Sequence, residues 1–370
     1  MLKVAILALS AKSYGGDSYF RGILPALAEY GGDAEFILLA SDARYQELCP
    51  DGGKVKLHVC GIPASHSGAA RILWEQFVCP FLLSRLGADV VFTANNIAFF
   101  FSPVPCVIAI RNMEPLSPIS ALTPFRLQVR HKILGYLTKL SIKRAARVVA
   151  VSHFVLDTLL TQRTPVKKID VISHGVDDLE ETRQDMVATA GTSSRYVASA
   201  AKFVRYANLA SLMRGFAKMR ALGYEGELRF AGGSYDRGYE REIRALVHSL
   251  DIESHVRFLG YIPRATVQEM IRNCDVFMFP STLEACPFTL LEAMRQGVPI
   301  VVSNAPPMPE FCGDAAVYVE SHDADGWAQA ACEIAFSQER RVRLRVKARE
   351  RARRFTWAKS VGQLVDSLRN

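Results

Sequence analysis

The sequence predicts an α/β protein made of two doubly wound domains with parallel sheets, and three observations lead to this fold class. The chain has 370 residues, about twice the length of an ordinary domain. Short runs rich in Val, Ile and Phe alternate with longer amphipathic stretches, and such continuously apolar strands are typical of parallel sheets buried on both faces. A polar stretch at 177–195, DDLEETRQDMVATAGTSSR, interrupts this alternation and marks the boundary between the domains.

The expected strands of the first domain, residues 1–178, are KVAILAL, AEFILLA, VKLHVCG, ADVVFTA, CVIAI, ARVVAVS and KIDVIS. Those of the second domain, residues 195–355, are RYVASAA, ELRFAGG, HVRFLGY, DVFMFP, PIVVS and AAVYVE. Helical composition lies between them, as in FRGILPALAEY, LASLMRGFAKMRALG and ATVQEMIRNC. Ligands bind such sheets at the carboxyl ends of the strands, so we expect the functional residues there, in a cleft between the domains.

The composition indicates a folded protein of a reducing compartment. Apolar residues make up 49 % of the chain, which is enough for full-sized cores. The eight cysteines are scattered, without a CxxC pair or histidines at zinc spacing, so we interpret them as buried thiols. The start MLKVAILAL is compatible with a signal peptide, but a first buried strand fits it better. The longest apolar run, IAFFFSPVPCVIAI, is shorter than the ~20 residues of a membrane span, so we expect a soluble, cytoplasmic protein.

A net charge of +8 and a pI of about 9.1 favour anionic partners. No RNP, zinc-finger or basic-zipper pattern is present, so we expect no nucleic-acid partner. The stretch Leu116–Phe154 contains no acidic residue. Its segment 125–149 combines apolar residues at helical spacing, namely Phe125, Val129, Ile133, Leu137 and Leu140, with the cations Arg126, Arg130, Lys132, Lys139, Lys143, Arg144 and Arg147. Such a helix either lies on an anionic membrane or is a domain helix with one solvated face. The Arg-rich run at 340–354 predicts a second, solvated helix.

The stretch STLEACPFTLLEAMRQGVPIVVS places two glutamates eight residues apart, Glu284 and Glu292. The preceding DVFMFPS reads as a strand that ends in a loop. Pro287 then suits the first helical position, FTLLEAMRQ is helical in composition, and Gly297 suits the C-terminal cap. Glu284 is therefore expected on the loop at the carboxyl end of a strand, and Glu292 about one turn inside the following helix.

This placement suits the binding of a nucleoside diphosphate. The free N–H groups and partial positive charge of a helix N-terminus can hold the diphosphate. Glu284 can accept hydrogen bonds from sugar hydroxyls, and Glu292 can accept them from two vicinal hydroxyls of a ribose. The alternative is that Glu292 is a helix-surface charge and that Glu284 merely complements the helix dipole.

The stretch PSTLEACPFTLLEAMRQGVPIVVSNAPPMPEFCGDAAVYVE resembles the donor site of the retaining family-4-type glycosyltransferases, with their E-x7-E motif and GT-B fold. The resemblance extends to YGGDSYFRGILPAL, AVSHFVLDTLL, VISHGVD, HVRFLGYIPRATVQEMIRNCDVFMFPS and RFTWAKSVGQLV. It implies two Rossmann-like domains that face a central cleft. The N-terminal domain, 1–178, would bind the acceptor and 195–355 the nucleotide-sugar donor, and the last helix, 356–370, would return to the N-terminal domain.

The resemblance also implies which residues bind the nucleotide sugar. Two glycines after the first strand would bring N–H groups to the diphosphate, although a plain tight turn predicts the same residues. The loop after HVRFL would frame the base, and the backbone after Glu284 would donate to the diphosphate, with one donor removed by Pro287. The implied donor-binding set is Gly15, Gly16, Gly260, Tyr261, Cys286, Phe288, Thr289, Leu290 and Glu292.

The catalytic residues that the resemblance implies are Glu284, Lys202, Arg205, Arg111 and Asn112. This set takes account of three departures from the family pattern. The usual Gly-Arg and Lys on the first loop of the second domain are replaced by Ser199–Ala200 and Ala207, so Lys202 and Arg205 are the candidate cations, with two surface bases as the alternative. Arg111–Asn112 stands where many members have His-Asp or His-Asn. Arg111 suits a phosphate and Asn112 a sugar hydroxyl.

No metal site and no cofactor is expected. The tripeptide Asp323–Ala324–Asp325 has the form of a metal-binding D-x-D, but it precedes a helical stretch, so we interpret Asp323 as an N-cap. The resemblance implies metal-independent chemistry, with the charge of the leaving diphosphate met by the helix dipole and by cations.

The resemblance thus implies a retaining glycosyltransferase that moves a hexose or deoxyhexose from a nucleoside-diphosphate sugar. The acceptor would be a saccharide or lipid-linked saccharide, in surface polysaccharide or glycan assembly, at a cytoplasmic site on the inner face of the membrane. The alternatives are a nucleotide-sugar-binding protein without turnover and a sugar-nucleotide epimerase. A phosphorylase would need a pyridoxal lysine, for which the sequence has no marker. Only the charge favours a nucleic-acid-binding protein.

Overall fold

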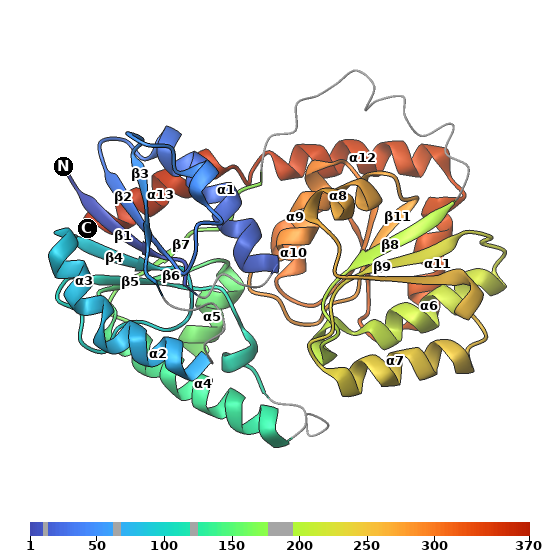
Figure 1. The fold of residues 1–370 in the computed structure, drawn as a ribbon. Coiled ribbons are helices and arrows are strands. Elements are labelled where there is room, and N and C mark those ends of the chain that lie inside the picture. The colour runs from blue at the N-terminus through green and yellow to red at the C-terminus, as the bar shows by residue number, and fades with distance from the viewer. Residues whose placement is uncertain (10–13, 62–67, 119–124, 177–194) are drawn as a thin grey trace. The chain divides into compact units, whose positions relative to one another are not determined.

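The computed structural model describes residues 1–9, 14–61, 68–118, 125–176 and 195–370. The chain divides into two compact units, which we describe separately. Unit 1 comprises residues 1–177 and 356–370, and unit 2 comprises residues 178–355. Each unit contains one parallel sheet with helices on both faces, which confirms the predicted α/β class (Figure 1).

Unit 1 is built on a seven-stranded sheet in the order β3-β2-β1-β4-β5-β6-β7. Every strand pair in it is parallel, and β1 pairs with β2 on one side and β4 on the other. The strands are β1 Lys3–Leu7, β2 Glu35–Ala40, β3 Val55–Val59, β4 Val90–Thr93, β5 Cys106–Ile110, β6 Arg147–Ala150 and β7 Ile169–Val171. All of them lie within the apolar runs that predicted strands.

The helices of unit 1 are α1 Tyr14–Tyr30, α2 Gly68–Phe77, α3 Cys79–Leu86, α4 Phe125–Arg144, α5 His153–Thr161 and α13 Trp357–Arg369. Short 3-10 turns are η1 Gln46–Leu48 and η2 Glu114–Leu116. The C-terminal helix α13 packs against α1, and both cover the same side of the sheet (Figure 1). Gly22 makes this packing possible, because a Cβ there would lie 2.4 Å from the ring of Trp357. The end of the chain therefore belongs to unit 1.

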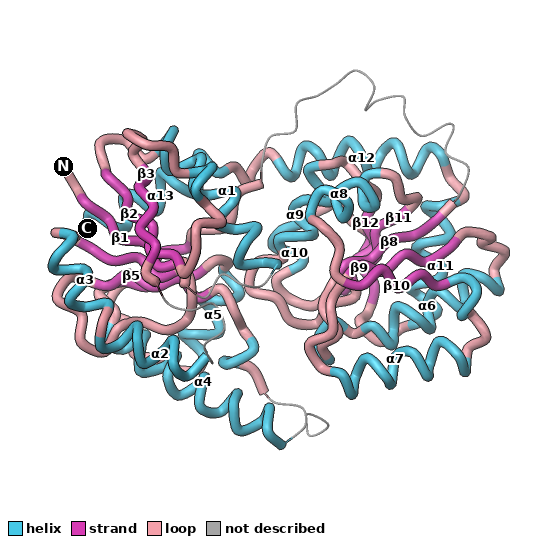
Figure 2. The backbone as a smooth tube through the Cα atoms, in the orientation of Figure 1, coloured by secondary structure: helices cyan, strands magenta, loops and turns pink. Residues whose placement is uncertain are grey.

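Unit 2 is built on a six-stranded parallel sheet in the order β10-β9-β8-β11-β12-β13 (Figure 2). Its strands are β8 Tyr196–Ala200, β9 Glu227–Ala231, β10 Val256–Gly260, β11 Val276–Phe279, β12 Ile300–Ser303 and β13 Val317–Val319. Its helices are α6 Leu209–Ala221, α7 Arg237–Ser249, α8 Arg264–Arg272, α9 Phe288–Arg295, α10 Met308–Cys312, α11 Ala324–Ala335 and α12 Gln338–Ala352, with 3-10 turns η4 Arg205–Ala207 and η5 Glu253–His255. These strands also match the predicted runs.

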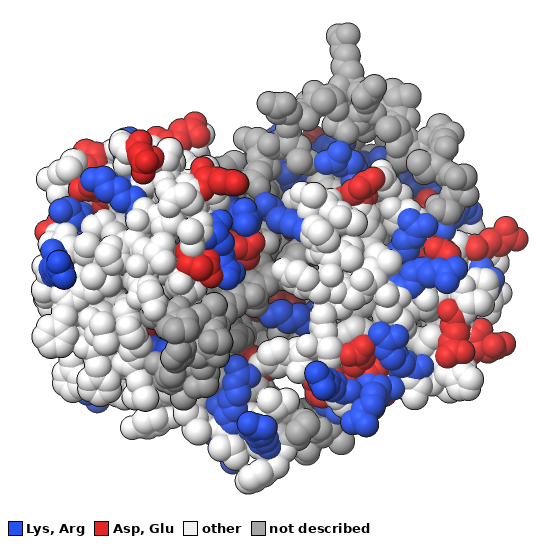
Figure 3. Space-filling view, in the orientation of Figure 1, with Lys and Arg blue, Asp and Glu red and all other residues white. Residues whose placement is uncertain are grey.

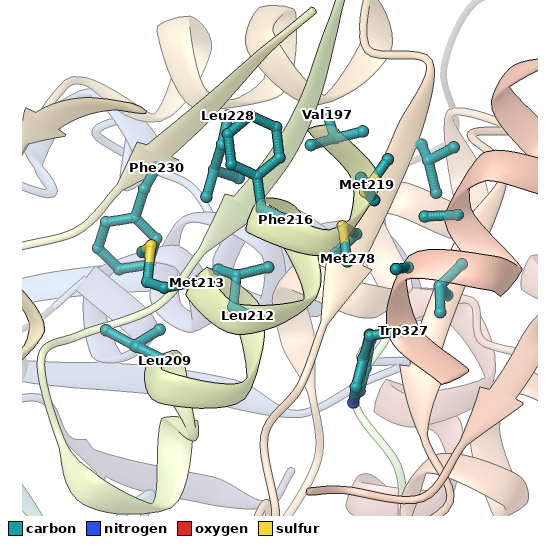
Figure 4. Packing of buried hydrophobic residues seen from close by; sticks show 14 of the residues in the cluster. Val197, Leu209, Leu212, Met213, Phe216, Met219, Leu228, Phe230, Met278 and Trp327 are labelled. Atoms are coloured by element: carbon teal, nitrogen blue, oxygen red, sulfur yellow. The ribbon is translucent and has the colours of Figure 1, made fainter. Parts of the chain in front are cut away.

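The core of unit 2 fills the space between its sheet and helices α6 and α11 (Figure 4). Phe216 from α6 lies against side chains of the sheet such as Leu228 and Met278, and Trp327 closes the cluster from α11. All four side chains are completely buried. Burial of such side chains contributes about 1.5–3 kcal/mol each, so this cluster stabilises the sheet beneath its loops.

Local differences from the predictions concern the starts of two helices. Helix α9 begins at Phe288, so Pro287 precedes it rather than forming its first turn. Gly15 and Gly16 lie in the first turn of α1 rather than in a loop before it. The predicted N-cap at the D-x-D tripeptide is confirmed, because the Asp323 carboxylate accepts a hydrogen bond of 2.9 Å from the Gly326 N–H.

Helix α4 departs from the amphipathic helix that the sequence predicts. Its buried residues are His131, Gly135, Thr138, Ser141 and Ile142. Of the predicted apolar stripe, Phe125, Val129 and Ile133 are exposed, whereas Leu137 and Leu140 are half-buried. The inward face is therefore mostly small and polar, and its solvent face carries large apolar side chains. Among the described helices, none combines the length and the apolar character that crossing a bilayer requires.

Candidate functional site

The strand order of unit 2 reverses between β8 and β11, which lie side by side at the centre of the sheet. In doubly wound sheets, ligands bind outside the carboxyl ends of the strands at this point. The loops that leave β8 and β11 are joined there, because the Tyr206 carbonyl accepts hydrogen bonds from the Thr282 N–H at 2.8 Å and from its hydroxyl at 3.1 Å. The predicted catalytic residues of the second domain lie on these loops.

Glu284 lies on the loop after β11, where the Ser281 hydroxyl donates a 2.9 Å hydrogen bond to its carboxylate. Burial raises the pKa of Glu284 to about 7, and the Ser281 hydrogen bond and the charge of Lys202 reduce that rise. Near neutral pH the carboxyl is therefore populated in both protonation states. It can accept hydrogen bonds from hydroxyl groups, and its protonated form can also donate one.

The two predicted cations of the β8 loop have different surroundings. Lys202 is exposed, and its charge acts on Glu284. Arg205 instead forms a two-pronged ion pair with Glu242, with distances of 3.0 and 2.8 Å, and its guanidinium lies over the ring of Tyr239. The structure therefore places Lys202 within the electrostatic reach of Glu284 and ties Arg205 to a carboxylate of α7.

Glu292 is buried on α9 and is not a solvated surface charge. One carboxylate oxygen, Oε1, accepts hydrogen bonds from Arg264 Nε at 2.8 Å and from Gln268 Nε2 at 3.2 Å, and Arg264 Nη2 lies 2.7 Å away. Both partners lie one turn apart on α8, directly after the loop that was predicted to frame the base. The sequence reasoning missed Arg264 and Gln268, although their i, i+4 spacing on a helix was visible.

The N-terminus of α9 carries the predicted backbone donors. The first bond into the helix runs from the Leu291 N–H to the Pro287 carbonyl, so the N–H groups of Phe288, Thr289 and Leu290 precede it. The side chains of Leu290 and Cys286 are buried, which leaves the backbone as the part of these residues that can meet a ligand.

The two residues predicted to frame the base are the last residue of β10, Gly260, and the first residue of the loop after it, Tyr261. Gly260 has a φ of +67°, a conformation that favours glycine, and its carbonyl accepts a 2.8 Å hydrogen bond from the Gly232 N–H. Tyr261 is 70 % exposed beside Gly233. This loop leads into α8, so it is connected to Glu292 through Arg264.

In unit 1 the strand order reverses between β1 and β4, and Arg111 connects the segments that follow these strands. Its guanidinium donates hydrogen bonds of 3.1 Å to the carbonyls of Gly15 and Ala94 and to His174 Nε2, and it lies 3.8 Å from the centroid of the Tyr19 ring. The structure therefore brings the predicted Arg111 and Gly15 together. His174 and Tyr19 were not predicted as site residues, although His174 lies in the quoted motif VISHGVD.

His174 and Asn96 hold Arg111 in place through hydrogen bonds. Burial, together with the neighbouring Arg111 charge, lowers the pKa of His174 well below its ordinary value, so the ring stays neutral and accepts from Arg111. The Asn96 amide oxygen accepts from the N–H groups of Arg111 and Asn112 at 3.1 Å each. The predicted Asn112 is exposed, and its own amide oxygen accepts a 2.9 Å bond from the Glu114 N–H.

Two family profiles match most of the sequence between them. The family described as "Glycosyltransferase Family 4" matches residues 15–179, and the family described as "Glycosyl transferases group 1" matches residues 181–351. The boundary between the two matches falls in the polar stretch at 177–195.

Two similar proteins are glycosyltransferases by name. A D-inositol 3-phosphate glycosyltransferase of Corynebacterium kroppenstedtii is 31 % identical over 161 residues, covering 42 % of this chain and 36 % of that protein. The O-antigen chain mannosyltransferase B of Escherichia coli is 28 % identical over 132 residues, covering 35 % of each chain. The matched stretches thus span about a third of the length of these relatives. The crystal structure of Anabaena HepE with UDP and glucose covers 100 % of both chains at a TM-score of 0.75 and 17 % identity, and this likeness shows the GT-B fold.

Proposed function

Because the chain belongs to the family-4-type, group 1 glycosyltransferases, we propose that it transfers a hexose or deoxyhexose from a nucleoside-diphosphate sugar to an acceptor hydroxyl. The observation that carries this proposal is the convergence of Glu284, Lys202 and the α9 N-terminus where the strand order of unit 2 reverses. The UDP and glucose bound to HepE support a donor of this class. The E. coli O-antigen mannosyltransferase supports a saccharide or lipid-linked saccharide acceptor in surface polysaccharide or glycan assembly.

In the proposed donor complex, the diphosphate lies against the N–H groups at the start of α9, with the Lys202 ammonium beside it. Glu284 binds hydroxyls of the transferred sugar, and Glu292 accepts hydrogen bonds from the ribose. Arg264 and Gln268 support this role, because they orient the Glu292 carboxylate before a ligand arrives. The exposed Tyr261 and the Gly260 turn would frame the base.

The proposed reaction retains the anomeric configuration and uses no metal or other cofactor. The acceptor hydroxyl attacks the anomeric carbon from the face that the diphosphate leaves, and the leaving phosphate oxygen takes the hydroxyl proton. In unit 2, Lys202 and the N–H groups of α9 stabilise the negative charge that grows on the leaving phosphate. Arg205 contributes only when its ion pair with Glu242 opens.

The predicted residues of unit 1 keep their proposed roles. Arg111 is proposed to bind phosphate, Asn112 a sugar hydroxyl, and Gly15 and Gly16 to present backbone N–H groups. The surroundings of Gly15 support close approach of a ligand, because a Cβ at that position would meet no other atom of the chain within 4 Å. We place the enzyme in the cytoplasm, in peripheral contact with the inner face of the membrane.

A two-stage experiment tests the function. Thermal shifts are first measured for the full chain and Glu292→Ala with UDP, GDP, dTDP and ADP and their common sugars. A ligand at ~100 times its Kd adds about 2.7 kcal/mol of stability, so one nucleotide class should stabilise the native chain and not the variant. Nucleotide release from that donor is then measured with and without added saccharide acceptors.

The outcomes separate the transferase from its alternatives. Release that depends on the acceptor supports glycosyl transfer. Sugar isomerisation without release indicates an epimerase, and donor binding without either reaction indicates a binding protein; both results would overturn the proposal. A native chain that no nucleotide stabilises would overturn the donor site itself.

A further inference from the structure

The inward face of α4 is bound to unit 1 by polar and small residues. His131 Nε2 lies 2.7 Å from the Glu114 carboxylate, and Gly135 packs so closely on η2 that a Cβ would lie 2.6 Å from the Pro115 carbonyl oxygen. Thr138 and Ser141 continue this buried face. Ile142 is the large apolar residue among the fully buried residues of α4, and Leu134 and Leu137 are half-buried.

The outward face of α4 carries a stripe of large apolar side chains. Phe125, Val129, Ile133 and Tyr136 are all exposed, with Phe125 at 79 % and Tyr136 at 69 %. At 3.6 residues per turn, these four positions fall within about 80° of the helix circumference, opposite the buried face. A water-exposed stripe of this kind is the reverse of an ordinary surface helix.

Cations border this stripe on both sides. Lys132, Lys139 and Lys143 lie along one edge, and Arg126, Arg130 and Arg144 lie along the other, as the helical spacing requires. No acidic residue occurs between Leu116 and Phe154, so the helix presents one sign of charge. An apolar stripe between two rows of cations is the pattern of a helix that lies in the interface of an anionic bilayer.

A second apolar stripe is fixed to the first through the loop after β4. Leu73, Phe77 and Phe81 are exposed at helical spacing along α2 and α3. On α2, the Gln76 side chain donates to the Ala98 carbonyl at 3.1 Å and accepts from the Phe100 N–H at 2.8 Å.

From α4, the Arg144 guanidinium donates to the Phe100 carbonyl at 3.0 Å and lies 5.7 Å from the centroid of the exposed Phe101 ring. Helices α2 and α4 thus both form hydrogen bonds to one loop, which carries the exposed Phe101. Figure 3 shows few charges on the surface over α2 and α3, and Lys and Arg side chains near the start of α4. A shallow cavity of about 340 Å³ beside this surface is lined mainly by apolar side chains, among them Trp74, Val78 and Leu82.

We propose that these two stripes, with Phe101 and the cations of α4, form a docking surface for a bilayer that contains anionic phospholipids. A bilayer offers hydrocarbon, which the apolar stripes can contact, and lipid phosphates, which the cations can bind. A second copy of the chain does not, because a two-fold interface would bring the cations of one copy against those of the other. That the acceptor is membrane-borne rests on the proposed function, whereas docking itself does not.

Vesicle co-sedimentation of the full chain tests the surface, with phosphatidylcholine alone and with added phosphatidylglycerol. The native chain should bind the anionic vesicles, and more weakly as salt rises. One cation near an anionic membrane changes binding about fivefold, so Lys139→Gln/Lys143→Gln should weaken binding about thirtyfold. Ile133→Ser/Tyr136→Ser should weaken it about tenfold or more without changing the charge.

The exposed residues of α12 and the segment after it in unit 2 supply matched controls. Val342→Ser/Val346→Ser removes two exposed apolar side chains, and Arg343→Gln/Arg354→Gln removes two exposed cations. Both controls should bind vesicles like the native chain. Equal losses in the controls, or no native binding to anionic vesicles, would overturn the proposal.

Two further readouts distinguish docking on a bilayer from self-association of the chain and from damage to the donor site. Native dimers in light scattering that Ile133→Ser/Tyr136→Ser dissociates, without vesicle binding, would assign the surface to a second copy and overturn the proposal. Nucleotide thermal shifts on the same variants should equal those of the native chain, because α4 carries none of the residues proposed to bind the donor. A failed vesicle test with intact nucleotide binding therefore refutes the docking surface and leaves the proposed function standing.

Discussion

Replacement of Glu284 by glutamine tests the electrostatics of the unit 2 site. Glu284 is half-buried, and burial raises its pKa from an ordinary 4.5 to about 7. The Ser281 hydrogen bond and the Lys202 charge oppose that rise but do not cancel it. Glutamine keeps the size of the side chain and an oxygen for the Ser281 hydroxyl, and it removes the charge whose burial is unfavourable.

The expected effect follows from the two pKa values. Below pH 4.5 the carboxyl is protonated in the folded and the unfolded chain, so Glu284 contributes no difference. Between pH 4.5 and 7 the unfolded chain loses the proton first, so the stability of the native protein falls as pH rises. Above pH 7 the loss levels off at about 3 kcal/mol, an upper limit because the side chain keeps partial contact with water.

We therefore expect Glu284→Gln to be more stable than the native chain by up to about 3 kcal/mol near pH 8.5, and by almost nothing near pH 4.5. Thermal unfolding of the full chain at several pH values measures this difference. For a unit of this size, each kcal/mol moves Tm by about 2–4 °C, so a gain of up to roughly 6–12 °C is expected in the transition of unit 2. Glu350→Gln on the exposed face of α12 corrects for the change in net charge.

A gain that is the same at all pH values, or no gain at high pH, would refute the reasoning. The first result would mean that glutamine packs better than glutamate, and the second that the carboxylate is well solvated. In either case the mixed protonation state assigned to Glu284 near neutral pH would be wrong.

Three other predictions concern the structure around the two sites. Arg264→Met should destabilise unit 2 by about 3–5 kcal/mol in urea unfolding, because it leaves the buried Glu292 carboxylate without its main cation, and adding Glu292→Gln should restore most of the loss. Gly297→Ala should lower Tm more than Gly260→Ala. Both glycines have a positive φ, which costs an alanine about 1–2 kcal/mol, but a Cβ at 297 would also lie 2.5 Å from an arginine side chain. Equal losses of Tm in the two variants would exclude that overlap. His174→Gln should flatten the fall in stability of unit 1 below pH 6.5, because a folded-state pKa below the ordinary value makes protonation oppose folding; an unchanged pH profile would contradict burial of a neutral ring.

The sequence alone determined the local structure of this protein. Continuously apolar runs such as KVAILAL and PIVVS are typical of inner strands of a parallel sheet, and each forms one. Asp323 caps its helix because a carboxylate three residues before a free N–H reaches it within one turn. Glu284 was placed at the carboxyl end of a strand by the turn and helix residues around it. These features depend on residues that are close to one another in the chain, and the sequence shows which residues these are.

Contacts between distant residues were decided by the tertiary structure. Glu292 is paired with Arg264, 28 residues away, because α8 packs beside α9. Arg205 is paired with Glu242, 37 residues away, because the η4 turn lies beside α7. No local pattern distinguishes a cation that faces a ligand from one that faces a carboxylate of its own chain.

The orientation of α4 shows the same limit. Its apolar spacing indicated a helix with one apolar side but could not say which side faces the core. The polar partner at Glu114 and the close packing at Gly135 turned His131 inward and left Ile133 in water. Side-chain periodicity specifies that a helix has two faces, and only the surface on which the helix packs determines which of them is buried.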